Sequence, residues 1–180
     1  MGNDLSTLLV AATGIAGTLF SPIITLRLSA RLQQDRMQAE RELALDVRRD
    51  AKEKAALSRK RDCYVALNGA ARRYRVVQMN YLDAVQEERL TEADRQALEE
   101  ALREYGYRVA EAQMVAARGV LEEMESIIVA LGSSYWRIRR LESGTPEAGG
   151  SYAEIRDDLV ALWDGWKQMR DAMRLDLGVE

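Results

Sequence analysis

Residues 5–26 read LSTLLVAATGIAGTLFSPIITL, a run of 22 residues without a charged side chain. As a helix that rises about 1.5 Å per residue, the run extends about 33 Å. The hydrocarbon core of a bilayer is roughly 30 Å thick. Asp4 precedes the run and Arg27 follows it. The sequence therefore predicts a transmembrane helix over residues 5–26, preceded by a short extracytoplasmic N-terminus of residues 1–4.

The charges beside this run predict its orientation. Arg27, Arg31, Arg36 and Arg41 follow the run, whereas no Lys or Arg precedes it. Basic residues collect on the cytoplasmic side of membrane spans. We therefore expect these four arginines at the inner leaflet of the plasma membrane and the C-terminal domain in the cytoplasm. Two alternatives stay open: a signal peptide, although that would need a basic start, and a helix buried in the core of a soluble oligomer.

Small residues recur within the predicted span at a spacing of four. Such residues let two membrane helices approach closely, so they form a candidate helix-association face; the alternative is that small residues are simply common in membrane helices. The face consists of Thr13, Gly14, Gly17, Thr18 and Ser21.

The composition favours an all-α fold after the span. The chain has 180 residues, only two prolines (Pro22 and Pro146), and 31% charged residues. Long stretches are therefore free to be helical. Residues 27–62 are highly charged and contain no Gly or Pro. They predict a helical stalk, or a coiled coil if their thin apolar stripe of Leu28, Leu32, Ala39, Leu43 and Val47 pairs with a copy of itself.

Three amphipathic helices are expected beyond the stalk. The first two form a long hairpin over residues 63–142. The first of them has an apolar stripe that includes Leu67, Tyr74 and Tyr81. The second starts at Thr91 and Asp94, which resemble a capping box, and its apolar stripe continues from Leu98 to Leu141, with a bend near Arg118 and Gly119. Residues 143–150 read SGTPEAGG and predict a linker. A third helix over residues 151–178 begins at a second capping box, Ser151 and Glu154, and ends at Gly178, where a C-terminal glycine is expected. It packs on the hairpin, so the bundle is antiparallel.

The residue types present restrict the chemistry. There is no histidine and one cysteine, Cys63. This excludes Ser-His-Asp catalysis, histidine-based zinc sites and an internal disulfide framework. Carboxylates occur in pairs but fall mostly off the apolar stripes, where water solvates them. We therefore predict no enzyme activity, no catalytic residue, no metal and no cofactor.

The charge distribution bears on partners. Residues 27–75 carry 14 Lys/Arg and 7 Asp/Glu, whereas residues 76–180 carry 12 and 21, within a net charge of −3. Basic groups occur at residues 59–61, 72–75 and 137–140. They could contact nucleic acid or anionic lipid headgroups, and lipid contact is expected for the membrane-proximal stalk, although salt bridges within the bundle are the simpler interpretation. No nucleic-acid-binding motif is present. The last helix offers one possible partner groove, with ordinary core as the alternative: Trp163, Trp166, Met169 and Met173.

Two stretches of the sequence resemble a known group of proteins. RDCYVALN at residues 61–68 with ARRY at 71–74, and MRDAM at 169–173 through Leu177 and Gly178, resemble a group of uncharacterised small actinobacterial proteins with an N-terminal transmembrane segment, a charged stalk and a helical domain. The resemblance implies a bacterial plasma membrane protein and implies no activity.

These features together favour a non-enzymatic, single-span membrane protein. Its cytoplasmic domain would act as an interaction or self-assembly module, so its partners would be the bilayer and either copies of itself or another cytoplasmic protein. One alternative is a membrane-active effector or pore component. The other is a soluble helical oligomer with residues 5–26 as its core.

Overall fold

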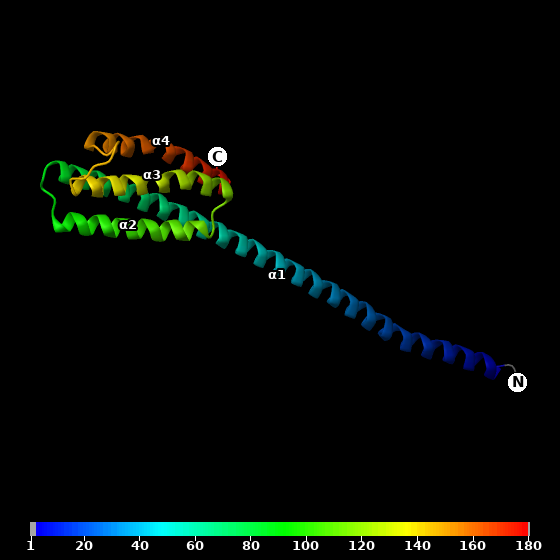
Figure 1. Cartoon of the computed structure of the whole chain (residues 1–180). Helices are drawn as coiled ribbons and strands as arrows, with labels where there is room; N and C mark the ends of the chain where they lie inside the picture. Colours follow the sequence, from blue (N-terminus) through cyan, green and yellow to red (C-terminus); the bar gives the residue numbers. More distant parts are fainter. Residues whose placement is uncertain (1–2, 180) are drawn as a thin grey trace. The chain divides into compact units, whose positions relative to one another are not determined.

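The computed structural model describes the backbone of residues 3–179 and the side chains of residues 33–179. Within these residues all regular structure is helical, in four helices and without a strand. In chain order these are α1 (Asn3–Gln86), α2 (Glu92–Gln113), α3 (Arg118–Glu142) and α4 (Tyr152–Asp176) (Figure 1). The prediction of an all-α chain is therefore confirmed.

The predicted span at residues 5–26 lies outside the residues whose side chains are described. The same is true of residues 1–4, of the small-residue face from Thr13 to Ser21, and of Arg27 and Arg31. These predictions remain predictions. Among the residues that the structure does describe, no helix combines the length and the apolar character that a membrane crossing requires.

The chain divides into two compact units, Met1–Lys54 and Ala55–Glu180. In the described part of the first unit, residues 33–54 are helical and every one of them is exposed. Arg49 Nε lies 3.2 Å from Glu53 Oε1, one helical turn away. Ion pairs of this kind contribute only about 0.3–0.5 kcal/mol each on an exposed helix. This stretch therefore gains no stability from a core of its own.

The second unit contains the hydrophobic core. Helices α2, α3 and α4 lie alongside the C-terminal part of α1 (Figure 1). Each helix contributes one apolar stripe, and the largest fully buried side chains include Tyr74, Tyr81, Leu98, Met124, Ile127, Leu131, Ile138, Ile155, Leu159 and Met169. These residues recur at three- and four-residue intervals, as expected where one face of each helix is buried.

The expected number of helices after the stalk is wrong. The sequence predicts one helix from residue 91 to about Leu141, but α2 ends at Gln113 and α3 begins at Arg118. The backbone of Ala117 is extended, with φ −70° and ψ 158°, so the helix cannot continue through it. The two helices then run antiparallel, because Arg95 near the start of α2 contacts Glu142 at the end of α3. The bundle consequently has four helical segments rather than three.

The two predicted capping boxes and the predicted C-terminal glycine are confirmed. Thr91 and Asp94 form a complete capping box at the start of α2, and Ser151 and Glu154 form another at the start of α4. In each box the hydroxyl accepts from a backbone N–H and the carboxylate accepts from the cap residue. Gly178 follows the end of α4 with a φ of 67°, in the left-handed region that glycine adopts most easily.

Candidate interaction surfaces

The proposed partner groove on α4 is largely closed. Trp166, Met169 and Met173 are all buried in the core of the second unit. They therefore form ordinary core and not an open groove, which corrects the prediction for these three residues. Trp163 differs, since it is 47% exposed and lies at the edge of the contact between α4 and α1.

Polar contacts place α4 against α1 in a defined antiparallel register. The hydroxyl of Tyr152 donates to Asp83 at 2.7 Å at one end of the contact. At the other end, Asp176 accepts from the hydroxyl of Tyr64 and lies 3.0 Å from Lys60 Nζ. Although partial burial works in the opposite direction, these two donors lower the pKa of Asp176 below its usual value. The carboxylate therefore stays ionised and holds the end of α4 on α1.

The exposed edge of this contact is basic and aromatic. The guanidinium of Arg72 lies over the ring of Trp163, 5.3 Å from the ring centroid. Lys167 and Arg170 line the same small pocket as these two residues, together with buried Trp166. A cation–π contact at an exposed site contributes about 0.5–1 kcal/mol. The arrangement places three positive charges around an exposed indole.

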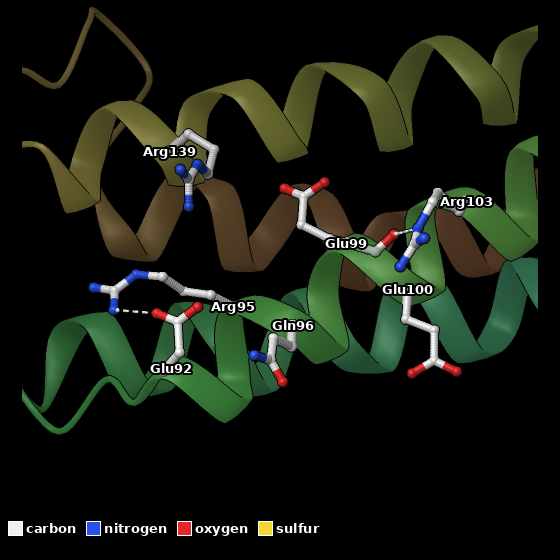
Figure 2. Close-up of a pocket in the computed structure, with 7 residues that line it drawn as sticks. All are labelled: Glu92, Arg95, Gln96, Glu99, Glu100, Arg103 and Arg139. Carbon is white, nitrogen blue, oxygen red and sulfur yellow. Dashed lines mark hydrogen bonds and ion pairs between the residues drawn. The ribbon is translucent and has the colours of Figure 1, made fainter.

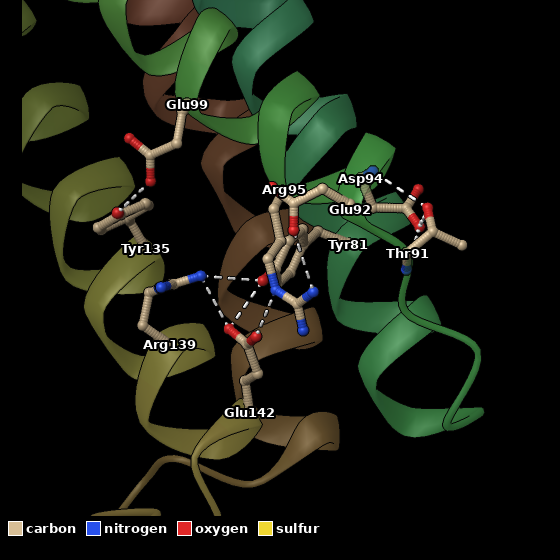
Figure 3. A network of polar contacts seen from close by, with 9 residues as sticks. All are labelled: Tyr81, Thr91, Glu92, Asp94, Arg95, Glu99, Tyr135, Arg139 and Glu142. Atoms are coloured by element: carbon tan, nitrogen blue, oxygen red, sulfur yellow. Dashed lines mark hydrogen bonds and ion pairs between the residues drawn. The ribbon is translucent and has the colours of Figure 1, made fainter.

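A second polar cluster joins α1, α2 and α3 near the C-terminal end of α1. The carboxylate of Glu142 accepts hydrogen bonds from Tyr81 at 2.7 Å, from Arg95 at 3.1 Å and from Arg139 at 2.9 Å (Figure 3). Although partial burial works in the opposite direction, these donors lower the pKa of Glu142. Burial and the bond to Glu142 raise the pKa of Tyr81 to about 12. The cluster is therefore a structural clasp in which each charged group has a partner.

An open cleft of about 460 Å³ lies beside this clasp. Three arginines and three glutamates line it, together with Gln96, and Figure 2 shows these side chains along α2 and at Arg139. Several of the charges are already paired, since Glu99 accepts from the hydroxyl of Tyr135 and Arg95 lies 3.5 Å from Glu92. The lining charges balance, so the cleft shows no preference for a ligand of either sign. Its charged residues are Glu92, Arg95, Glu99, Glu100, Arg103 and Arg139.

The remaining predicted residues are placed as follows. The side chains of Arg36 and Arg41 are exposed in the first unit, and their contact with the inner leaflet stays a prediction. Cys63 is buried, and burial is the main reason that its pKa is raised. Within residues 33–179, no group of three or more His, Cys, Asp or Glu side chains is placed to hold a metal ion. The predicted lack of a cofactor is likewise untested.

Sequence reasoning missed the contacts that join distant residues. The contact between Arg72 and Trp163, the clasp around Glu142 and the bond from Arg75 to the Leu159 carbonyl each pair residues on different helices. Helical spacing shows which residues share a face of one helix, but it does not show which faces meet. The basic residues between Arg72 and Arg75 were the one feature of the sequence that pointed to any of these contacts.

No protein-family description matches the chain, and neither a curated protein nor a solved structure shows significant similarity to it. The resemblance to small actinobacterial proteins therefore remains a prediction from the sequence alone.

Proposed function

We propose that this chain is a non-enzymatic, single-span membrane protein whose C-terminal helical bundle serves as a cytoplasmic interaction or self-assembly module. The observation that supports this proposal most directly is the contrast between the two units. Residues 33–54 are exposed throughout, whereas residues 55–180 bury a core with contributions from all four helices. A domain with its own core thus follows a helical segment, residues 33–54, in which no side chain is buried.

An exposed helix of this kind becomes more stable when its ends are held in place or when a partner covers it. Isolated helices are marginally stable in water, and most helical stability in proteins comes from packing. Residues 33–54 nevertheless present exposed Leu43, Leu45 and Val47. A bilayer anchor before this stretch and the bundle after it would fix both ends. A second copy or another protein would cover the apolar side chains.

The proposed orientation of the chain in the membrane rests on the charges beside the apolar run. Arg27, Arg31, Arg36 and Arg41 follow the apolar run and no basic residue precedes it. Their placement favours a cytoplasmic bundle. The bundle itself carries more acidic than basic residues, so an anionic leaflet attracts the arginines that follow the run and not the bundle as a whole. In the actinobacterial group that the chain resembles, the same order of segments occurs.

Fractionation of the full chain tests the anchor. A charged residue at the middle of a span costs about 2.5–3.5 kcal/mol, so Ile15→Arg should move the protein out of carbonate-washed membranes. Leu45→Arg is the matched control, since it lies outside the run and should stay membrane-bound. Protease added from the cytoplasmic side should digest the bundle of the wild-type chain. A wild-type chain that is soluble without detergent would refute the anchor and leave the soluble oligomer.

The module itself is tested in detergent. The purified full chain should run as an oligomer in light-scattering chromatography or should retain a cytoplasmic partner through purification. A strictly monomeric chain that retains no partner would contradict the interaction role while leaving the anchor in place.

A further inference from the structure

The outer face of α3 is left uncovered by the rest of the described chain. Val129 is 63% exposed and Trp136 is 66% exposed, although both side chains are large and apolar. They lie seven residues apart, which on a helix of 3.6 residues per turn places them on one stripe. The buried side chains of α3, which include Ile127, Leu131 and Ile138, occupy the opposite face. An apolar stripe of α3 thus faces water.

Small residues lie on this stripe between Val129 and Trp136. Gly132 and Ser133 stand at its middle. A Cβ atom added at Gly132 would meet nothing within 4 Å, so no close contact inside this chain requires a glycine there. Glycine within a helix costs about 1 kcal/mol relative to alanine. A second helix that approaches at this point would make use of the glycine, because no side chain would then separate the two backbones.

The charges on the stripe are segregated along its length. Glu122 and Glu125 precede Val129 by seven and four residues, and Arg140 follows Trp136 by four residues. The stripe therefore has an acidic end, an apolar centre and a basic end, in that order. A stripe with this order is complementary in charge to a copy of itself that runs in the opposite direction.

The other two arginines at the basic end of α3 are held within the chain. Arg137 is paired with Asp158, and Arg139 is paired with Glu142. Arg140 is therefore the cation that the stripe presents.

The charged groups on the stripe can change partners. Arg140 pairs with Glu147 in the loop after α3, and Glu122 pairs with Arg118. All four of these side chains are at least 43% exposed, so each ion pair contributes little stability. The side chain of Glu125 has no ion pair or hydrogen bond within residues 33–179. A second molecule can therefore engage these groups without breaking a strong internal contact.

We propose that α3 pairs two copies of this chain in an antiparallel dimer with two-fold symmetry, centred on residues 132–133. In this register Val129 of each copy packs on Trp136 of the other, and Glu125 of each copy lies opposite Arg140 of the other. A two-fold axis repeats every favourable contact twice. The inference rests on the proposed function, since it names a second copy of the chain as the partner of the bundle.

The direction of α1 decides from which side each copy reaches the dimer. Gln78 donates to the carbonyl of Leu131 and, further along both helices, Tyr81 donates to Glu142, so α1 and α3 run in the same direction within the second unit. Antiparallel α3 helices therefore place Ala55 of the two copies at opposite ends of the dimer. Copies anchored in two facing membranes satisfy this arrangement, whereas neighbours in one flat membrane do not.

Disulfide formation in the full chain tests the register. Cys63→Ala removes the native thiol, which is buried and packs as a small apolar group. Ser133→Cys then places a thiol beside the two-fold axis. Ser126→Cys is the matched control, since Ser126 is also exposed and lies seven residues earlier on the same side of α3. In the antiparallel dimer the two thiols of this control lie about 20 Å apart along the helices, beyond the reach of a disulfide.

Oxidation in mild detergent should cross-link two copies through Ser133→Cys and should leave Ser126→Cys uncross-linked. A parallel pair in register would cross-link both variants equally, because every position of the stripe would then face its own copy.

Charge exchange gives the second measurement. One helix from each copy makes a small interface, so the dimer should depend on concentration. Glu125→Arg and Arg140→Glu each replace two attractive contacts by repulsive ones, and each should raise the dissociation constant about tenfold or more in sedimentation velocity. An equal mixture of the two variants should form the dimer again, since every Arg then faces a Glu. Both side chains are exposed, so the circular dichroism spectrum should stay unchanged.

Vesicles that carry the full chain with its bundle outside test the direction of approach. Wild-type vesicles should cluster, which turbidity measures, and vesicles with Arg140→Glu should stay dispersed. Clustering should return when vesicles that carry Glu125→Arg are mixed with vesicles that carry Arg140→Glu.

The outcomes separate this inference from the proposed function. A membrane-bound chain that stays monomeric, that cross-links equally at both serines, or that leaves its vesicles dispersed overturns pairing through α3 and leaves the anchor in place. A chain that is soluble without detergent yet cross-links only through Ser133→Cys supports the dimer and refutes the anchor. A chain that is both soluble and monomeric overturns both.

Discussion

The indole nitrogen of Trp166 lies 2.6 Å from the side-chain oxygen of Asn68 and donates a hydrogen bond to it. The bond joins α4 to α1 midway between the contacts of Tyr152 with Asp83 and of Asp176 with Lys60. Trp166 is buried, so its N–H has little access to water. A buried indole N–H usually finds an acceptor of this kind. Asn68 thereby fixes the register in which α4 packs.

Asn68→Ala should lower the free energy of unfolding by about 1–3 kcal/mol, because it leaves a buried donor without its acceptor. Urea denaturation followed by circular dichroism measures this change. Asn80→Ala is the matched control, since Asn80 is an exposed asparagine on the same helix, and it should be neutral or slightly stabilising. Equal stability of the two variants would mean that the bond to Trp166 does not hold the helices together.

The second prediction concerns Glu142, because its carboxylate accepts hydrogen bonds from three donors on three helices. Glu142→Gln should destabilise the bundle at neutral pH by about 1–3 kcal/mol, since an amide accepts less strongly than a carboxylate and adds two competing donors. Glu100→Gln is the control, because Glu100 lines the adjacent cleft and is exposed. If the two variants unfold at the same urea concentration, the clasp does not contribute.

The same residue predicts a pH dependence. The pKa of Glu142 is lower in the folded protein than its ordinary value of 4.5, so the unfolded chain takes up the proton first as pH falls. Its contribution to stability is present above about pH 4.5 and is lost as pH drops through the lowered folded value. Urea midpoints measured across this range should fall less steeply for Glu142→Gln than for the wild type. Parallel curves would contradict this assignment.

The buried tyrosines should make the fold lose stability as the pH rises, whereas Glu142 makes it lose stability as the pH falls. Burial and the bond to Glu142 raise the pKa of Tyr81 to about 12, from an ordinary value of 10.0. Burial also raises the pKa of Tyr74 and Tyr105. The neutral phenols therefore stabilise the fold below pH 10, and this stability is lost as pH rises through the raised values. Tyr81→Phe should reduce the alkaline loss of stability, and ultraviolet titration of tyrosinate should show one late-titrating tyrosine fewer than in the wild type, because Tyr74 and Tyr105 remain.

The parts of this fold that the sequence predicts are those that depend on one helix at a time. The stripe containing Leu67, Tyr74 and Tyr81 is buried as expected. The two capping boxes are formed as expected, including the one in which Asp94 replaces the usual Glu. Each of these features is set by residues within a few positions of one another, where helix geometry fixes the neighbours.

Features that join separate helices could not be predicted in this way. Trp163 and Trp166 both fit the apolar row of α4, yet one is exposed and the other buried. Helical spacing gives the width of a buried face only approximately, and the packing of α1 against α4 decides which side chains at its edge are covered. Two of the three partners of Glu142, Arg95 and Tyr81, lie 47 and 61 residues away in sequence, so no local pattern reveals them.

The break between α2 and α3 shows the same limit and leads to the last prediction. The apolar stripe continues through the break at an unchanged spacing, with Ala112, Ala116 and Val120 four residues apart. Neither Gly nor Pro occurs from residue 114 to 117. Periodicity alone therefore predicts one helix, whereas the structure places Ala117 as the N-cap of α3 with extended backbone angles.

Ala117→Ser distinguishes the two arrangements by the sign of its effect. At an N-cap, the serine hydroxyl can accept from a backbone N–H in the first turn of α3, which alanine cannot, and the gain is about 1 kcal/mol. Within a continuous helix the same substitution would instead cost about 0.5 kcal/mol, because serine is the poorer helix former. Ala161→Ser, at an exposed position inside α4, provides the reference for that cost. Urea denaturation should show Ala117→Ser more stable than the wild type and Ala161→Ser less stable; a loss of stability in both would mean that residue 117 lies inside a helix.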